Sequence, residues 1–274
     1  MLTPVGVNDF FPEEMADFEA VLGKLNGVFQ GAGYQKVRTP SLEYYDTLAV
    51  GMGPEFSRRA VKLFDVHGEV MVLRPDHTVP IARMVATRLH NRPLPLRLSY
   101  FNSIFRTSKG WDQDIETFQA GAELLGATGP EADAEMVALC IASLKALGYT
   151  DFVVDIGHTQ FAQAFSQDAH EALLNGDYVT LGQIPVRGER EVISQYPELC
   201  LMDEILSKKG LSPYVRYNKG LVKELDYYTG LIFECCVPGF SAPVGSGGRY
   251  DGLLGKFGFP CPAVGFALHL SELL

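Results

Sequence analysis

Acidic, amide and hydroxyl side chains recur at short, regular spacing in two places in this sequence. Asp76 and Thr78 stand two residues apart, directly after an apolar stretch. Gln119 and Glu123 flank Gly121 in a segment that reads as a strand, where alternate positions share one face. Such groups can bind an ammonium through charge-assisted hydrogen bonds. The alternatives are that the first pair only caps a following helix and that the second pair lines a solvent-exposed strand.

Two further runs combine aromatic or charged residues with glycine. Leu225–Glu234 contains the adjacent pair Tyr227 and Tyr228, and packing on a strand explains one of these tyrosines but not the whole run. Gly245–Gly248 is rich in glycine, which allows a backbone to approach a ligand closely. It lacks the patterns of nucleotide-binding loops. The alternative is that the nearby Arg249 and Asp251 simply pair and fix a turn.

Composition excludes several classes of function. The chain has 274 residues, a net charge of −10 and a pI of about 5.1, and its longest basic runs are two residues, which argues against a nucleic-acid partner. Neither the histidines nor the five cysteines show metal-ligand spacing, so we predict no metal site. No signal or membrane-spanning segment is apparent. These features predict a cytoplasmic protein without a membrane partner.

The pattern of apolar residues predicts an α+β fold, with long antiparallel strands and helices before and after them. The whole chain, 1–274, reads as a single domain with a small helical insertion at about 158–212. The predicted helices are 15–29, 78–89, 129–147 and one at the C-terminus, and the predicted strands are 34–37, 63–66, 70–73, 97–106, 117–124, 152–156, 214–217, 222–228 and 231–237.

Several of these segments, in the same order, resemble motifs of histidyl-tRNA synthetases, which are class II aminoacyl-tRNA synthetases. The matching segments are Tyr34–Glu43, Leu73–Thr78, Arg97–Gly126, Leu225–Glu234, Gly245–Leu253 and Pro262–Leu273. The resemblance implies an antiparallel sheet flanked by helices, and a dimer interface at the first motif, around Pro40. It also implies a set of residues around bound L-histidine, which are Asp76, Thr78, Arg106, Gln119, Glu123, Tyr227 and Tyr228.

The sequence departs from the synthetase pattern at positions that serve ATP chemistry. Glu272 stands where the synthetase has an arginine that clamps the triphosphate, and a carboxylate repels phosphate. Lys223 and Glu224 replace an arginine–glycine pair that includes the catalytic arginine, so a planar fork becomes a point charge. Ser108 replaces a glutamate of the second motif. We therefore predict no catalytic residues and no cofactor.

This combination resembles the histidyl-tRNA synthetase-like regulatory subunits of ATP phosphoribosyltransferase. The resemblance implies a non-catalytic protein that binds histidine for feedback in the first step of histidine biosynthesis. It also implies a short-form catalytic subunit as partner, a homodimer within a hetero-oligomer, and no anticodon-binding domain. We expect Gly245–Gly248 and the loop Thr107–Glu116 to be flexible borders of the pocket. The alternatives are a truncated histidyl-tRNA synthetase catalytic domain and an amino-acid ligase paralogue that uses ATP.

Overall fold

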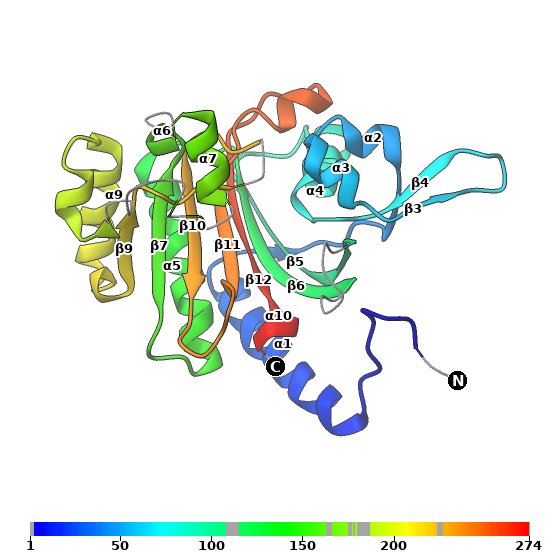
Figure 1. The fold of residues 1–274 in the computed structure, drawn as a ribbon, viewed down its shortest axis with the longest axis horizontal. Coiled ribbons are helices and arrows are strands. Elements are labelled where there is room, and N and C mark those ends of the chain that lie inside the picture. The colour runs from blue at the N-terminus through cyan, green and yellow to red at the C-terminus, as the bar shows by residue number, and fades with distance from the viewer. Residues whose placement is uncertain are drawn as a thin grey trace.

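The computed structural model describes residues 3–107, 115–162, 166–174, 177, 179, 187–223 and 227–273. Its largest element is a nine-stranded sheet (Figure 1). From one edge to the other, the strands are β1 (Gln35–Lys36), β5 (Leu96–Phe105), β6 (Glu116–Leu125), β12 (Ala263–His269), β11 (Gly245–Arg249), β10 (Leu231–Cys236), β7 (Val153–His158), β9 (Val215–Asn218) and β8 (Arg187–Gly188). Neighbouring strands are antiparallel except for β1 with β5 and β7 with β9.

Three helices cover one face of this sheet: α1 (Pro12–Gly31), α5 (Gly129–Leu147) and α9 (Pro197–Lys208). Helix α5 packs against both α1 and α9 and also contacts β6 and β12. Its C-terminus is capped by Gly148, whose φ of 103° is in the left-handed region that favours glycine. The sequence correctly predicts the helices α1 and α5.

A second, smaller antiparallel sheet lies on the side of the molecule that carries β5 and β6 (Figure 1). Its strand order is β2 (Leu42–Tyr44), β4 (Val70–Leu73) and β3 (Lys62–Phe64). Three short helices pack around it: α2 (Tyr45–Ala49), α3 (Pro54–Arg59) and α4 (Thr78–Met84), the last continued by the π-helical turn η1 (Val85–Leu89) (Figure 1). The predicted strands 63–66 and 70–73 correspond to β3 and β4, which pair as an antiparallel hairpin. This subassembly faces the long strands β5 and β6 and brings the start of α4 to the main sheet.

Alternation along β6 separates the two sides of the main sheet. Ala120, Ala122 and Leu124 are fully buried in the core beneath α1 and α5. Gln119 and Glu123 therefore point to the opposite side, toward α4. The predicted shared face of positions 119, 121 and 123 is confirmed, and this face is covered rather than exposed to solvent.

The described part of the predicted insertion is largely helical. It contains α6 (Thr159–Ala162), α7 (Gln167–Leu174), η2 (Arg190–Ile193) and α9, and it ends at η3 (Ser212–Tyr214). Outside this region, the described residues also form η4 (Leu254–Phe257) and α10 (Leu270–Leu273). Leu199, Met202 and Leu206 of α9 belong to the main core. Its status as an inserted unit remains a prediction.

Two sequence expectations are corrected by the structure. Gly245–Gly248 is not a flexible segment but most of β11, in the middle of the sheet. The described residues of 222–228 form no strand. Strand β12 runs through Gly265 to His269 before α10 begins. Most of the loop Thr107–Glu116 lies outside the described residues.

Long-range packing explains these corrections. A Cβ on Gly247 would lie 2.4 Å from the carbonyl oxygen of Gly265 and 2.6 Å from the Phe233 ring. Position 247 must therefore be glycine for β11 to fit between its neighbouring strands. Strand β7 already pairs with β9 and β10 and offers no edge to residues 222–228. Within the described residues, no helix is long and apolar enough to cross a membrane.

Candidate functional site

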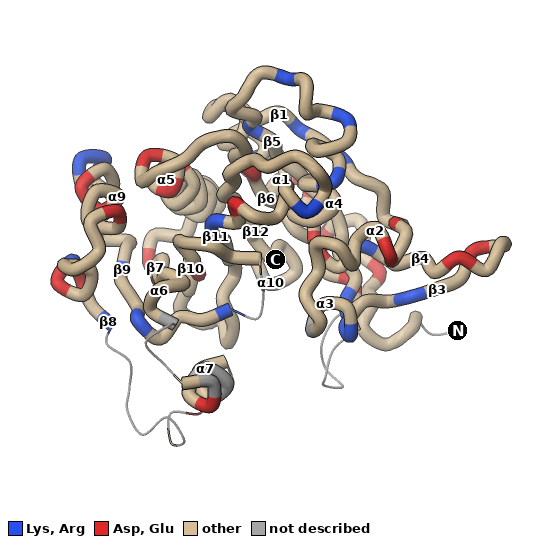
Figure 2. The backbone as a smooth tube through the Cα atoms, turned by 90° about the horizontal axis from the view of Figure 1, so that it is seen from above, with Lys and Arg blue, Asp and Glu red and all other residues tan. Residues whose placement is uncertain are grey.

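A cavity of about 320 Å³ opens between the main sheet and the start of α4. The sequence-predicted residues that line it are Asp76, Thr78, Arg106, Gln119, Tyr227 and Tyr228. Figure 2 shows charged positions of both signs around the periphery of the molecule and few along the central strands β10, β11 and β12. Asp76, which lines the cavity, is buried, so its electrostatic interactions are stronger than they would be in water.

Asp76 connects α4 to the tyrosine pair. Its Oδ1 accepts the backbone N–H of Val79 at 3.1 Å, in the first turn of α4, while its Oδ2 accepts the Tyr227 hydroxyl at 3.5 Å. Asp76 therefore does contribute a hydrogen bond to the first turn of α4, while its other carboxylate oxygen is directed toward a residue of the cavity wall. Burial raises the pKa of Asp76, and the nearby Arg106 opposes this rise.

Arg106 supplies a positive charge beside Asp76. Its Nε donates a hydrogen bond to the carbonyl oxygen of Pro75 at 2.6 Å, and its guanidinium lies 4.6 Å from the centroid of the Phe56 ring. Burial lowers the pKa of Arg106, whereas Asp76 acts to raise it. A carboxylate and a guanidinium therefore share one wall, an arrangement that complements the ammonium and carboxylate of a free amino acid.

Glu123 lies behind the wall rather than on it. Its Oε1 accepts the Thr78 hydroxyl at 2.9 Å, and its Oε2 accepts the Tyr250 hydroxyl. A Cβ on Gly265, its cross-strand partner, would lie 1.6 Å from Oε2, so the absence of a side chain there makes room for the carboxyl. Burial raises the pKa of Glu123 to about 8, so this carboxyl is mostly protonated at neutral pH.

Gln119 pairs across the sheet with a histidine that the sequence does not single out. Its Nε2 lies 3.2 Å from Nδ1 of His269, which also lines the cavity. Burial is the main cause that lowers the pKa of His269 to about 3, so the ring is neutral. An amide N–H that donates to Nδ1 leaves the proton of the neutral ring on Nε2. Only the register of β6 with β12 reveals this contact.

The space beside Gly121 is filled by the side chain of Tyr100. A Cβ on Gly121 would lie 2.4 Å from the Tyr100 hydroxyl. The ring of Tyr100 also lies 4.3 Å from that of His77. His77 contacts the Asn102 carbonyl oxygen through Nε2 at 3.1 Å, and its buried Nδ1 has no partner among the described residues. Tyr100 and His77 are thus wall residues that the sequence does not identify.

The tyrosine pair forms the aromatic side of the cavity. The rings of Tyr227 and Tyr228 lie 5.0 Å apart, and that of Tyr250 is 5.9 Å from Tyr227. Burial raises the pKa of each of these phenols, so all three are neutral. Neutral phenols offer both aromatic surface and hydrogen-bonding hydroxyls to a planar ligand group.

Lys223, at the position where the synthetase pattern has its catalytic arginine, is held in an ion pair. Its Nζ donates to Oε1 of Glu234, and both side chains line the cavity with 17% and 23% exposure. The charge of Lys223 is therefore balanced within the chain. Ser108 and Glu224, and the side chain of Glu272, lie outside what the structure describes.

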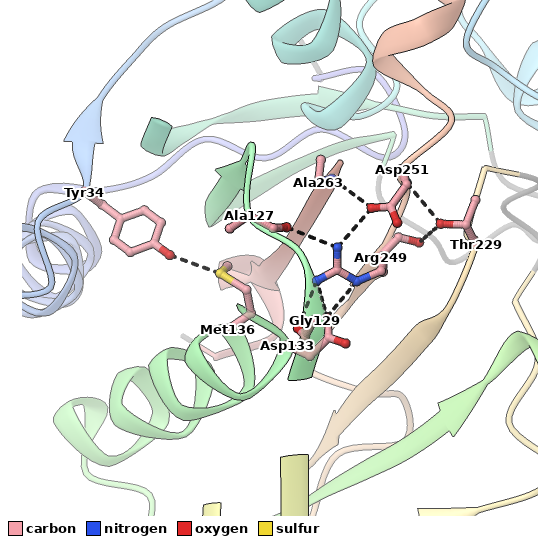
Figure 3. A network of polar contacts seen from close by, with 9 residues as sticks. All are labelled: Tyr34, Ala127, Gly129, Asp133, Met136, Thr229, Arg249, Asp251 and Ala263. Carbon is pink, nitrogen blue, oxygen red and sulfur yellow. Dashed lines mark hydrogen bonds and ion pairs between the residues drawn. The ribbon is translucent and has the colours of Figure 1, made fainter. Parts of the chain in front are cut away.

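A network around Arg249 anchors the segment that carries the tyrosines (Figure 3). Arg249 donates to Asp133 of α5 at 2.7 Å and to Asp251 at 3.0 Å, which confirms the predicted pairing with Asp251. Its carbonyl oxygen accepts the N–H of Thr229 at 2.8 Å. Because Thr229 follows the tyrosine pair directly, this network fixes the pair relative to α5. Among the described residues, no group of His, Cys, Asp and Glu could hold a metal ion.

A family model described as histidyl-tRNA synthetase matches residues 6–176 and 185–273. Two similar proteins, from Moorella thermoacetica and Symbiobacterium thermophilum, are 36% and 37% identical. Alignment with each covers 99% of this chain, and 80% and 78% of the respective relative. Both are named ATP phosphoribosyltransferase regulatory subunit.

Solved structures agree with this similarity. A Bacillus halodurans protein titled ATP phosphoribosyltransferase regulatory subunit/histidyl-tRNA synthetase is 32% identical, with a TM-score of 0.91 over 99% of this chain and 82% of that one. Apo histidyl-tRNA synthetase from S. aureus, at 23% identity and a TM-score of 0.74, covers 100% of this chain and 69% of its own and shows the shared fold. The predicted α+β class II fold is confirmed, and the chain belongs to the histidyl-tRNA synthetase family, among members named as regulatory subunits of ATP phosphoribosyltransferase.

Proposed function

We propose that this chain is a non-catalytic regulatory subunit of ATP phosphoribosyltransferase that binds L-histidine in the cavity. The observation that carries the proposal is the wall where Asp76 and Arg106 place opposite charges beside the rings of Tyr227 and Tyr228. The names of the relatives support the regulatory role. The partner would be a short-form catalytic subunit, in a cytoplasmic complex that contains a homodimer of this chain.

Each part of histidine has a chemical counterpart in this cavity. The carboxylate of Asp76 suits the ammonium group, and the guanidinium of Arg106 suits the carboxylate. The imidazole would lie against the aromatic side, where Tyr227 and Tyr228 offer ring faces. The Thr78 hydroxyl donates a hydrogen bond to Glu123, which also accepts one from Tyr250. In this proposal, Thr78 and Glu123 shape the cavity wall and act on the ligand through these hydrogen bonds.

The groups near Lys223 argue against an aminoacyl-adenylate reaction. A lysine presents a compact charge and not the planar fork of arginine, so it matches phosphate oxygens less specifically. Here that charge is already neutralised by Glu234. In the transition state of adenylate formation, negative charge builds on phosphate. Lys223 would stabilise that charge poorly, because the carboxylate of Glu234 already neutralises the lysine.

Isothermal titration calorimetry with L-histidine tests the binding proposal, with L-leucine as the comparison ligand. We expect one saturable site for histidine and none for leucine. Asp76→Asn keeps a capping oxygen for Val79 but removes the charge, and should weaken binding by about ten- to hundredfold, because hydrogen bonds to charged groups contribute about 1.5–3 kcal/mol. Asp46→Asn, on the exposed surface of α2, should leave affinity unchanged. Equal binding of both amino acids would overturn the proposal.

The second candidate is a histidyl-tRNA synthetase catalytic domain, favoured by the name of the matching family model. Histidine-dependent exchange of pyrophosphate into ATP separates the two candidates. We expect no exchange above a no-histidine blank, even at saturating histidine. Sustained exchange that vanishes in Arg106→Ala would instead support the synthetase reading.

A further inference from the structure

Arg74 is the largest of the fully buried side chains, with 2% exposure. Within the described part of the chain, none of its contacts is with a carboxylate, and its guanidinium is surrounded by carbonyl and hydroxyl oxygens. Burial lowers its pKa to about 10, so it remains charged at neutral pH. A buried charge is costly even though the nearby Glu43, itself paired with Arg83, acts to raise the pKa of Arg74, and an apolar side chain of similar size could fill the same volume. We therefore attribute the presence of the guanidinium to the hydrogen bonds by which it holds backbone carbonyl groups in place.

The groups that Arg74 holds come from two separate segments. Its Nε donates to the carbonyl oxygen of Ser103 in β5 at 2.9 Å. Its Nη1 donates to the carbonyl oxygens of Thr39 and Pro40 at 2.7 and 2.9 Å. Its own backbone N–H donates to the carbonyl oxygen of Ser41 at 2.9 Å. Arg74 thus binds the segment Thr39–Ser41 to the edge region of the main sheet.

The same residue begins the loop that forms one wall of the cavity. Pro75 follows it and accepts the hydrogen bond from Arg106, and Asp76 comes next, with its carboxylate on Val79 and Tyr227. Only one residue separates Arg74 from Asp76. A shift of the Arg74 backbone must therefore move Pro75 and Asp76 or break these hydrogen bonds.

We propose that Arg74 is a positioning residue that couples the segment Thr39–Ser41 to the cavity loop Asp76–Thr78, so that the position of the first sets the histidine affinity of the second. The coupling deepens the proposed function and rests on it for the identity of the ligand. The segment reaches the surface immediately afterwards, where Leu42 is 42% and Tyr44 is 54% exposed. Arg74 therefore links a surface strand to the wall of the cavity through direct hydrogen bonds.

Arg74→Lys tests the coupling, because lysine keeps the charge but loses the fork that binds Thr39, Pro40 and Ser103 together. Hydrogen exchange at the Val79 amide, which bonds to Asp76, reports the loop without any ligand. We expect this amide to exchange about tenfold faster and the histidine Kd to rise about tenfold. Arg97→Lys is the matched control, because Arg97 also binds through two guanidinium nitrogens but lies away from the cavity. Its Nε and Nη2 donate to the carboxylate of Glu135. It should change neither quantity.

The outcomes separate this inference from the proposed function. If the Val79 amide exchanges no faster in Arg74→Lys than in the wild type, or if the histidine Kd stays unchanged, Arg74 is merely structural and the coupling is overturned. If wild-type protein fails to bind histidine while Val79 responds, the coupling stands and the ligand assignment falls. Should Arg74→Lys fail to fold, Thr39→Gly loosens the same segment with the guanidinium intact, and the same two measurements decide.

Discussion

At the scale of single residues, Glu123 should make the stability of the protein depend on pH. Its folded-state pKa of about 8 lies above the ordinary value of 4.5. Between these values the native protein holds a proton that the unfolded chain releases, so the free energy of unfolding falls as pH rises from 4.5 toward 8. His77 and His269 act in the opposite sense: their folded-state pKa values of about 3 lie below 6.5, so stability falls as pH drops below 6.5.

Glu123→Gln should therefore flatten the alkaline side of the stability profile. Urea denaturation at several values from pH 6.5 to 8.5 should show wild-type stability falling across this interval, within the pKa window of Glu123. In the variant, stability should stay nearly constant there and still fall in acid, where the two histidines titrate. An unchanged alkaline slope in the variant would assign the effect to another group.

At the scale of elements, the sequence predicts what is local. The apolar spacing of 15–29 gives α1, and alternation along β6 places Gln119 and Glu123 on one face. It cannot predict contacts that depend on strand order, because Glu123 and Tyr250 are 127 positions apart and meet only when β12 and β11 lie beside β6. The glycines of β11 read as a flexible segment for the same reason: the rings that fill their missing side chains come from distant strands.

Gly265→Ala tests the fit between β12 and β6. The added methyl would overlap Glu123 Oε2 and lie 2.8 Å from the Ala122 carbonyl oxygen, so the carboxyl must leave its hydrogen bonds to Thr78 and Tyr250. We expect a loss of about 1–3 kcal/mol in unfolding free energy, together with weaker histidine binding.

The matched control is Gly23→Ala in α1, where nothing lies within 4 Å of the new Cβ. That change should stabilise the protein by about 0.5–1 kcal/mol, because alanine favours the helix interior. Denaturation of the two variants under identical conditions distinguishes a specific clash at Gly265 from a general sensitivity to glycine replacement. Equal effects of the two changes would contradict the tight fit.

At the scale of the whole molecule, the Arg249 network ties the central sheet to α5. Arg249 is 8% exposed, and Arg249→Met would leave Asp133, which is 15% exposed, without its ion-pair partner. Breaking such a pair typically costs about 3–5 kcal/mol. Arg190→Met disrupts a more exposed pair with Glu204, at 49% and 44% exposure, and should destabilise the protein much less, because solvent screens exposed ion pairs. Thermal and urea unfolding of both variants would check this ranking, which similar losses would contradict.

Regulation, as proposed, also belongs to the whole molecule. If histidine alters the affinity of this chain for the catalytic subunit, the catalytic subunit must alter the affinity for histidine by the same factor. Typical couplings are about 1–3 kcal/mol. Calorimetry of histidine binding with and without the catalytic subunit, and of subunit association with and without histidine, should yield one common factor. A histidine effect on enzyme rate that persists without this chain would exclude the regulatory role.

The close contacts between glycines and large side chains constrain how this pocket can diverge. Gly265 faces Glu123, Gly121 faces Tyr100, and the Tyr228 ring would lie 2.7 Å from a Cβ on Gly248. Enlarging the small member of a pair produces overlap, and shrinking the large member leaves a void. A lineage that acquires a new ligand must therefore change both members together or pass through a destabilised intermediate. We expect descendants of this chain to retain these pairs intact or to exchange both residues, so that ligand preference shifts in rare, two-residue steps.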